Sequence, residues 1–232
     1  MATMTATTPV SPLAEREAES FVGGVFEVNH PLVECHLTRL RDHQTEPTEF
    51  RAIVRRLASL LAYEALKDLR TEPLDVETPV ARAAGCRLSQ RIAIVPILRA
   101  GLGMVEPVLD LVPQAEVWHL GLYRDETTAQ PVEYYCKLPA DGPVDVALVL
   151  DPMLATGGSA VAAMSALDHW GVAQIKLIAL IASQEGCKLV ETEFPNAQVY
   201  VCHIDADLND KKYIVPGLGD AGDRIFNTVR HS

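Results

Sequence analysis

The polar residues with the clearest chemical potential lie in the run Ala147–Ser159, which reads ALVLDPMLATGGS. An apolar stretch ends in the carboxylate of Asp151, and a short connection then leads into Thr156, two glycines and Ser159. Glycines let backbone N–H groups approach a ligand, and a helix that begins there directs its positive dipole end at the same place. The combination suits an anion that carries hydroxyl groups, such as a ribose phosphate. An ordinary strand–turn–helix connection with a hydroxyl cap is the alternative interpretation.

A second segment of this kind is Pro96–Met104, in which an apolar run meets Arg99 and is followed by Ala100 and Gly101. A guanidinium group presents a planar fork of donors that matches paired phosphate oxygens. Two small residues after it let the backbone come close to a ligand. The segment therefore predicts a phosphate or diphosphate contact at Arg99, with a surface arginine on a turn as the alternative.

A third segment, Tyr213–Phe226, contains three glycines and one proline. This composition predicts a tight loop whose backbone N–H and C=O groups can face a ligand. A planar base with alternating donors and acceptors could be recognised by such a loop. Either Asp220 or Asp223 is expected to cap the final helix, which leaves the other to meet a hydroxyl or a developing positive charge.

The elements that must position these segments follow from the hydrophobic pattern. Short apolar runs predict buried strands over residues 91–98, 116–123, 144–150, 175–181 and 198–204. Helical spacing predicts helices over residues 49–69, 102–111, 158–170 and 188–194. Strands that are continuously apolar and alternate with helices indicate an α/β fold with a mostly parallel central sheet. Ligands of such sheets bind outside the carboxyl ends of the strands, where Asp151 and Arg99 are both expected.

Composition narrows the classes of function. The chain has 232 residues, with 20 lysines and arginines against 31 acidic residues, so its formal net charge is −11. Binding of a polyanion needs a basic face, which disfavours nucleic acid as the main partner. Five scattered cysteines without a C-x-x-C pair predict neither a disulfide framework nor a zinc site, and favour a cytoplasmic location. The pattern predicts no membrane span, and it predicts a flexible tail over residues 1–24 ahead of one domain over residues 25–232.

Taken together, the three segments resemble those of the uracil phosphoribosyltransferase family, and the resemblance extends from about Val28 to Phe226. In that family the stretch matching residues 151–159 binds the ribose 5-phosphate of phosphoribosyl pyrophosphate (PRPP), and we call it the PRPP loop. Residues 96–104 match the diphosphate loop and residues 213–223 match the uracil loop. The resemblance implies transfer of the 5-phosphoribosyl group from PRPP to N1 of uracil, which gives UMP and diphosphate. It also implies the type I phosphoribosyltransferase fold, with a small hood and a mobile flap at about residues 121–140.

The resemblance carries roles onto individual positions of this chain. The implied PRPP-binding residues are Arg99, Arg124, Asp151, Pro152, Met153, Leu154, Ala155, Thr156, Gly157, Gly158, Ser159 and Asp220. The implied uracil-binding residues are Ile214, Gly219, Asp220 and Ala221. Asp151, Arg99 and Asp220 are the implied catalytic residues, which act electrostatically, and no general base is identified. The resemblance also implies that the protein itself supplies no metal ligand, because Mg²⁺ would arrive bound to PRPP.

Partners and alternatives complete these expectations. Family members are dimers or larger, so the resemblance implies a homodimer or higher homo-oligomer that binds uracil and PRPP, without nucleic acid or membrane. Two positions depart from the family pattern: Lys212 stands where glycine is usual, and Glu49 where a basic residue is common. Because some members respond to GTP, Glu49 leaves a GTP effector open. A non-catalytic PRPP-binding regulator and a phosphoribosyltransferase for another base remain the alternative functions.

Overall fold

A computed structural model describes residues 23–124, 131–136, 138–139 and 142–228 of the chain. These residues fall into two compact units: residues 68–90 belong to one, and the remainder belong to the other. Within the described ranges, no helix combines the length and the apolar character that crossing a membrane requires. The larger unit contains all three segments that the sequence singled out.

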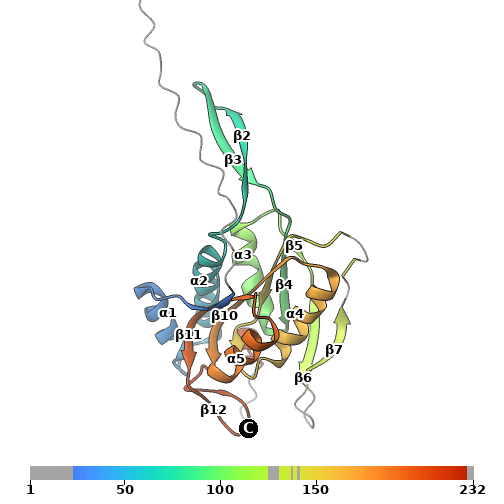
Figure 1. The fold of residues 1–232 in the computed structure, drawn as a ribbon. Coiled ribbons are helices and arrows are strands. Elements are labelled where there is room, and N and C mark those ends of the chain that lie inside the picture. The colour runs from blue at the N-terminus through green and yellow to red at the C-terminus, as the bar shows by residue number, and fades with distance from the viewer. Residues whose placement is uncertain (1–22, 125–130, 137, 140–141, 229–232) are drawn as a thin grey trace, which may run out of the picture. The chain divides into compact units, whose positions relative to one another are not determined.

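The larger unit is built on one central sheet (Figure 1). Its described strands follow the spatial order β1 (Gly24–Glu27), β11 (Gln198–Asp205), β10 (Gln174–Ser183), β8 (Val146–Leu150), β4 (Ile92–Leu98), β6 (Leu120–Arg124) and β7 (Pro131–Cys136). Two short strands lie off this path: β5 (Glu116–Val117) pairs with β4, and β9 (Met153–Leu154) pairs with β10. Every pair is parallel except β6 with β7. The predicted mostly parallel α/β fold is therefore confirmed.

Helices cover both faces of this sheet, which explains why the central strands β4 and β8 are apolar along their whole length. One face carries α1 (Pro31–Arg41), α2 (Pro47–Ala65) and α3 (Val105–Leu111), and the other carries α4 (Gly158–Trp170) and α5 (Gln184–Glu193), as Figure 1 shows. Under α4, Met164 and Leu167 join the apolar cluster that contains Val95, Val149 and Leu177 from the strands. The last helix, α6 (Ala221–Phe226), packs against α2 and the 3₁₀ turn η1 (Ala100–Met104).

The predicted elements differ from the observed ones mainly where a predicted helix or strand is divided into two. The helix predicted at 158–170 is observed with those bounds as α4. The single helix predicted at 102–111 is instead the turn η1 followed by α3, and the strand predicted at 116–123 is divided into β5 and β6. The prediction omitted β1 and α1, whose side chains are partly exposed.

The smaller unit contains a β-hairpin that the sequence did not predict. It consists of β2 (Thr71–Glu77) and β3 (Arg82–Leu88), paired antiparallel from Thr71 with Leu88 to Glu77 with Arg82. Most of its side chains are exposed, so neither strand carries the apolar face from which a strand is recognised. At the turn, the Thr78 hydroxyl accepts from the N–H groups of Val80 and Ala81.

Two predicted regions lie partly outside the described residues. Residues 1–22 of the predicted N-terminal tail are outside them, and the prediction for that tail stays untested. Of the predicted hood and flap at about residues 121–140, β6 and β7 form an antiparallel pair at the edge of the sheet. Residues 125–130, 137 and 140–141 of that region are not described.

Candidate active site

The PRPP loop and the diphosphate loop begin at the ends of neighbouring strands. Pro96 of β4 is paired with Leu150 of β8, so Arg99 and Asp151 follow the same carboxyl edge of the sheet. Gly101 lies directly against that edge, because a Cβ atom there would come within 2.3 Å of the Leu150 carbonyl oxygen. Only glycine permits this approach. The sequence-based expectation that Asp151 and Arg99 share one sheet edge is confirmed.

The PRPP loop leads into α4 through a glycine. Gly157 is the residue before the helix, and its φ of 84° lies in the left-handed region that favours glycine. No side chain caps this helix, so the alternative interpretation of a hydroxyl cap is not realised. The N–H groups in the first turn of a helix and its dipole together attract an anion. The positive end of α4 therefore follows Asp151 and the short strand β9 (Met153–Leu154) within a few residues along the chain.

Asp151 is the most strongly perturbed acid of the site. Burial of its side chain raises the pKa of the carboxyl to about 7, and the N–H of Met153, 3.3 Å from Oδ1, works against that rise. Close to neutral pH the group therefore exists in both protonation states. A hydroxyl donor or a developing positive charge beside it would favour the carboxylate form.

Ser183, a residue that sequence reasoning missed, hydrogen-bonds to the backbone of the PRPP loop. Its hydroxyl donates to the carbonyl oxygen of Ala155 and accepts from the N–H of Gly186 at 2.9 Å. Ser183 is buried at the end of β10 and caps α5. A serine between an apolar strand and a predicted helix was the signal that could have identified it.

Arg99 and the end of the uracil loop meet across the site. A guanidinium nitrogen of Arg99 lies 3.4 Å from Oδ1 of Asp223. The N–H of Asp223 donates to the Asp220 carboxylate at 2.9 Å, so Asp220 is the residue that caps α6. Thr228 donates its hydroxyl to the same oxygen of Asp223 at 2.6 Å. The sequence left open which aspartate caps the helix, and the structure assigns that contact to Asp220.

The uracil loop is bounded by two short elements. It is entered through β13 (Ile214–Val215), which pairs antiparallel with β12 (Asp207–Leu208), and it ends at the cap of α6. Ile214 and Ala221 are buried, whereas Gly219 stands in the left-handed region with a φ of 79°. Three of the four predicted uracil contacts therefore flank one turn of backbone, and Ile214 lies at its entrance.

Lys212, where the family usually has glycine, also adopts a left-handed conformation, with a φ of 62°. Its N–H donates to the Asn209 carbonyl at 2.7 Å, and the Asn209 side chain accepts from the N–H groups of Lys211 and Tyr213. The Lys212 ammonium group lies 3.6 Å from Glu185. The lysine side chain thus points outward, while its backbone keeps a conformation that a glycine would adopt without strain.

Arg124, the remaining predicted PRPP ligand, is the last residue of β6. Strand β6 is parallel to β4, and Gly121 is paired with Leu98. The backbone of Arg124 therefore lies at the same carboxyl edge of the sheet as Arg99. The side chain of Arg124 falls outside the described residues, so its predicted role is untested.

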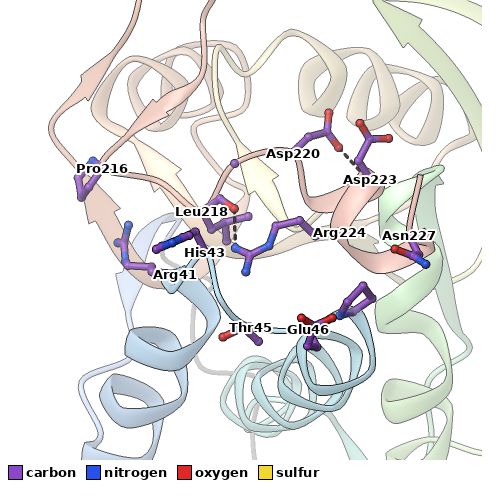
Figure 2. A pocket seen from close by; sticks show the side chains of 12 residues that line it. Arg41, His43, Thr45, Glu46, Pro216, Leu218, Asp220, Asp223, Arg224 and Asn227 are labelled. Carbon is purple, nitrogen blue, oxygen red and sulfur yellow. Dashed lines mark hydrogen bonds between the residues drawn. The ribbon is translucent and has the colours of Figure 1, made fainter. Parts of the chain in front are cut away.

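A cavity of about 520 Å³ adjoins the uracil loop (Figure 2). It lies between the segment 216–227 and the segment 41–47, and among the predicted site residues described it is lined by Gly219 and Asp220. The remaining lining side chains include Arg41 and Arg224, neither of which the sequence analysis singled out. The cavity is therefore a neighbour of the uracil loop, and the residues of the PRPP loop lie elsewhere.

Sequence reasoning also missed the ion pair between Arg41 and Asp205. Asp205 ends the buried strand β11 as Asp151 follows β8, so an acid after an apolar run was an available signal. Arg41 carried no comparable signal, because its partner lies 164 positions further along the chain. Within the described residues, no group of three or more His, Cys, Asp or Glu side chains could enclose a metal ion.

Comparisons with known proteins agree with this arrangement. Residues 27–228 match the family model for uracil phosphoribosyltransferase. The uracil phosphoribosyltransferase of Roseiflexus castenholzii is 55% identical over 204 residues, which cover 88% of this chain and 98% of that relative. The one from Geobacillus kaustophilus is 50% identical over 208 residues, or 89% of this chain and 100% of the relative.

The solved structure of the AQ2163 protein from Aquifex aeolicus is similar to this chain, with a TM-score of 0.84 and 37% identity. The match covers 89% of this chain and 100% of that one. The chain belongs to the uracil phosphoribosyltransferase family.

Proposed function

We propose that the protein transfers the 5-phosphoribosyl group of PRPP to N1 of uracil, giving UMP and diphosphate. The observation that carries this proposal is the meeting of the three loops in one unit. Gly101 of the diphosphate loop packs against the end of β8, and Arg99 contacts Asp223 at the end of the uracil loop. Family membership and the names of the relatives support the same activity.

The PRPP loop is proposed to hold the ribose 5-phosphate. Thr156, Gly157, Gly158 and Ser159 lie at the start of α4, where the helix dipole favours a phosphate. The hydroxyl-rich ribose would then lie toward Asp151, whose carboxylate can accept from the ribose hydroxyl groups. This orientation directs the anomeric carbon and its diphosphate toward Arg99 and, in the family pattern, Arg124.

The uracil loop is proposed to bind the base through its backbone. Uracil presents alternating carbonyl acceptors and N–H donors, and peptide groups supply both complements. Ile214, Gly219 and Ala221 offer backbone groups around one turn. Asp220 keeps one carboxylate oxygen on the N–H of Asp223, and its second oxygen is the one that would face PRPP.

The reaction follows from the placement of charge. N1 of uracil forms a bond to the anomeric carbon as the bond from that carbon to the diphosphate oxygen breaks, with inversion, and the N1 proton passes to water or diphosphate. Positive charge develops on the ribose and negative charge on the diphosphate. Asp151 stabilises the first and Arg99 the second. Because burial raises the pKa of Asp151 to about 7, the stabilisation of positive charge by its carboxylate depends on pH.

Mg²⁺ is proposed to arrive with PRPP. This proposal rests on the family resemblance, and on the preference of Mg²⁺ for phosphate oxygens, which the diphosphate of the substrate would supply. When bound, the ion neutralises charge that builds on the leaving group. Arg99 and Asp151 remain the protein groups that orient the substrate.

A GTP effector and a homo-oligomer stay predictions of the family resemblance. Glu49, which replaces a commonly basic residue, forms an exposed ion pair with Arg39, its Oε1 lying 2.8 Å from Nε. This local pairing accounts for an acid at that position without reference to a nucleotide. The edge pair β6–β7 is proposed to belong to the hood.

The direct test is to incubate the purified protein with PRPP, Mg²⁺ and radiolabelled uracil, and to measure UMP and diphosphate. Equal amounts of the two products are expected. Product from hypoxanthine or orotate but not from uracil would assign another base to the loop. Absence of any nucleotide product, together with tight binding of RNA or DNA, would instead identify a non-catalytic regulator.

A further inference from the structure

One ion pair holds both backbone groups of a residue in the uracil loop. Asp205 ends β11, and its side chain is 2% exposed. Its two carboxylate oxygens accept from Arg41 Nη1 and Nη2, each at 2.8 Å. The N–H of Gly217 donates to Asp205 at 3.2 Å, and the Gly217 carbonyl accepts from Arg41 at 2.8 Å. The pair therefore binds Gly217 from both sides of its peptide backbone.

The next carbonyl of the loop is held by a second arginine. Arg224 donates to the carbonyl oxygen of Leu218 at 2.8 Å, and Figure 2 shows its side chain reaching back to that residue. The same guanidinium donates to the carbonyl oxygens of Leu40 and Asp42 at 2.8 and 2.6 Å, and it lies 4.3 Å from the centre of the Phe50 ring. Successive peptide groups of the loop are thus fastened to the end of α1.

These contacts matter for function because the uracil loop is proposed to bind the base through its backbone groups. A side chain can change rotamer to recover a contact, but a peptide group can do so only if the loop moves. Hydrogen bonds weaken steeply when their distance or angle departs from the preferred range. Loss of Arg41 is also costly, because the buried Asp205 carboxylate would be left without its charged partner. Arg41 and Asp205 therefore set the position of the Gly217 peptide groups, and Arg224 sets that of the Leu218 carbonyl, directly before Gly219.

We propose that Arg41 and Asp205 are positioning residues for the base: they fix the uracil loop so that its backbone matches uracil, and they do not act on PRPP. This inference rests on the proposed function. Neither residue belongs to the PRPP loop or the diphosphate loop. A role confined to base recognition predicts that uracil and PRPP respond differently to loss of the pair.

The test compares Arg41→Lys and Asp205→Asn with the matched control Arg39→Lys. Arg39 lies on the same helix and forms ion pairs with Glu49 at 2.8 Å and with Asp42 at 2.7 Å, but its side chain is exposed and its recorded contacts do not include the uracil loop. Lysine at position 41 keeps the charge but lacks the fork that reaches Asp205 and Gly217 together. The measurements are kcat/KM for uracil at saturating PRPP, and the affinity for Mg²⁺–PRPP by calorimetry without uracil.

For both variants we expect kcat/KM for uracil to fall about 10- to 100-fold, as a loop displacement of the order of 1 Å produces. The affinity for Mg²⁺–PRPP should stay within about two-fold of wild type, and Arg39→Lys should leave both quantities unchanged. Values for uracil within two-fold of wild type, or an equal loss for uracil and PRPP, would overturn the inference. If Asp205→Asn does not fold, Arg41→Lys decides alone. A wild-type protein that makes no UMP would overturn the proposed function and this inference with it, whereas an active wild type with insensitive variants overturns the inference alone.

Discussion

The guanidinium of Arg99 approaches the carboxylate of Asp223 to 3.4 Å, which joins the end of β4 to helix α6. Arg99 directly precedes η1, and Asp223 lies in the first turn of the helix that Asp220 caps. The two carboxylates at the end of the uracil loop therefore have different partners. Asp220 accepts from a backbone N–H, while Asp223 faces the arginine that is proposed to receive diphosphate.

This contact predicts competition between Asp223 and the substrate. If diphosphate binds Arg99 as proposed, it competes with Asp223 for the Nη2 group that lies 3.4 Å from the carboxylate, so the variant Asp223→Asn should bind Mg²⁺–PRPP more tightly. Because both side chains are partly exposed, the gain should be modest, about two- to five-fold in Kd at low salt. Titration calorimetry measures it. Thr228→Val, which removes the hydroxyl on the same carboxylate oxygen but keeps the charge, is the control and should leave Kd unchanged. Weaker binding by Asp223→Asn would show that the aspartate assists the substrate instead.

Removal of the Arg99 guanidinium should affect the leaving group. Arg99→Gln should lower kcat/KM for PRPP by about 10²–10³-fold, the usual effect of losing one donor to a developing negative charge. Steady-state kinetics with varied PRPP provides the measurement. Arg55→Gln is a matched control, because Arg55 is another exposed arginine whose ion pair, with Glu106, lies outside the three loops. Equal effects of the two substitutions would exclude a specific role for Arg99.

The parts of this structure that the sequence predicted are those with a local signal. Helix α4 was predicted with its observed bounds because its apolar spacing lies between Gly157 and Gly171, both with positive φ. The hairpin of β2 and β3 was not predicted, since its exposed strands show no buried face. Arg41 and Asp205 could not be paired from the sequence either, because tertiary folding alone brings together residues 164 positions apart.

The candidate site shows the same division. The three loops were recognised from residues that are consecutive in the sequence, and the chain folds them to one edge of the sheet. Which aspartate caps α6 required the structure, because Asp220 and Asp223 both fit the local pattern of a cap. For the positive φ at Lys212, the signal was the glycine that the family usually has there, because lysine itself rarely adopts that conformation.

The ionised carboxylate of Asp151 should lower the free energy of unfolding, although the same charge is proposed to support the reaction. Its pKa is raised from 3.8 to about 7 in the folded protein, so the native state binds the extra proton more tightly than the unfolded chain. By linkage, this group's contribution to stability is fully present below about pH 4 and is lost as pH rises toward 7 and above. Asp151→Asn removes that loss. We expect the variant to be more stable than wild type by about 4 kcal/mol at pH 8, because a rise of about three pKa units at about 1.4 kcal/mol each is then expressed in full, with the difference vanishing below about pH 4.

Thermal unfolding of Asp151→Asn and wild type across this pH range tests the stability effect, and turnover tests the role of the charge. Turnover should fall by about 10²-fold or more, because asparagine cannot stabilise positive charge on the ribose. An unchanged rate would remove Asp151 from the mechanism. A stability difference that stays constant with pH would show that its carboxyl does not titrate in this range.

The left-handed backbone at Lys212 predicts that glycine stabilises the entrance to the uracil loop. Lysine at a φ of 62° is strained, and the exposed ion pair with Glu185 offsets little of that strain. Lys212→Gly should therefore raise the free energy of unfolding by about 0.5–1 kcal/mol, as measured by urea denaturation. Lys211→Gly is the matched control: Lys211 does not have positive φ, so glycine there adds only flexibility to the unfolded chain and should destabilise. Destabilisation by both substitutions would mean that the side chain of Lys212 contributes more than its backbone strain removes.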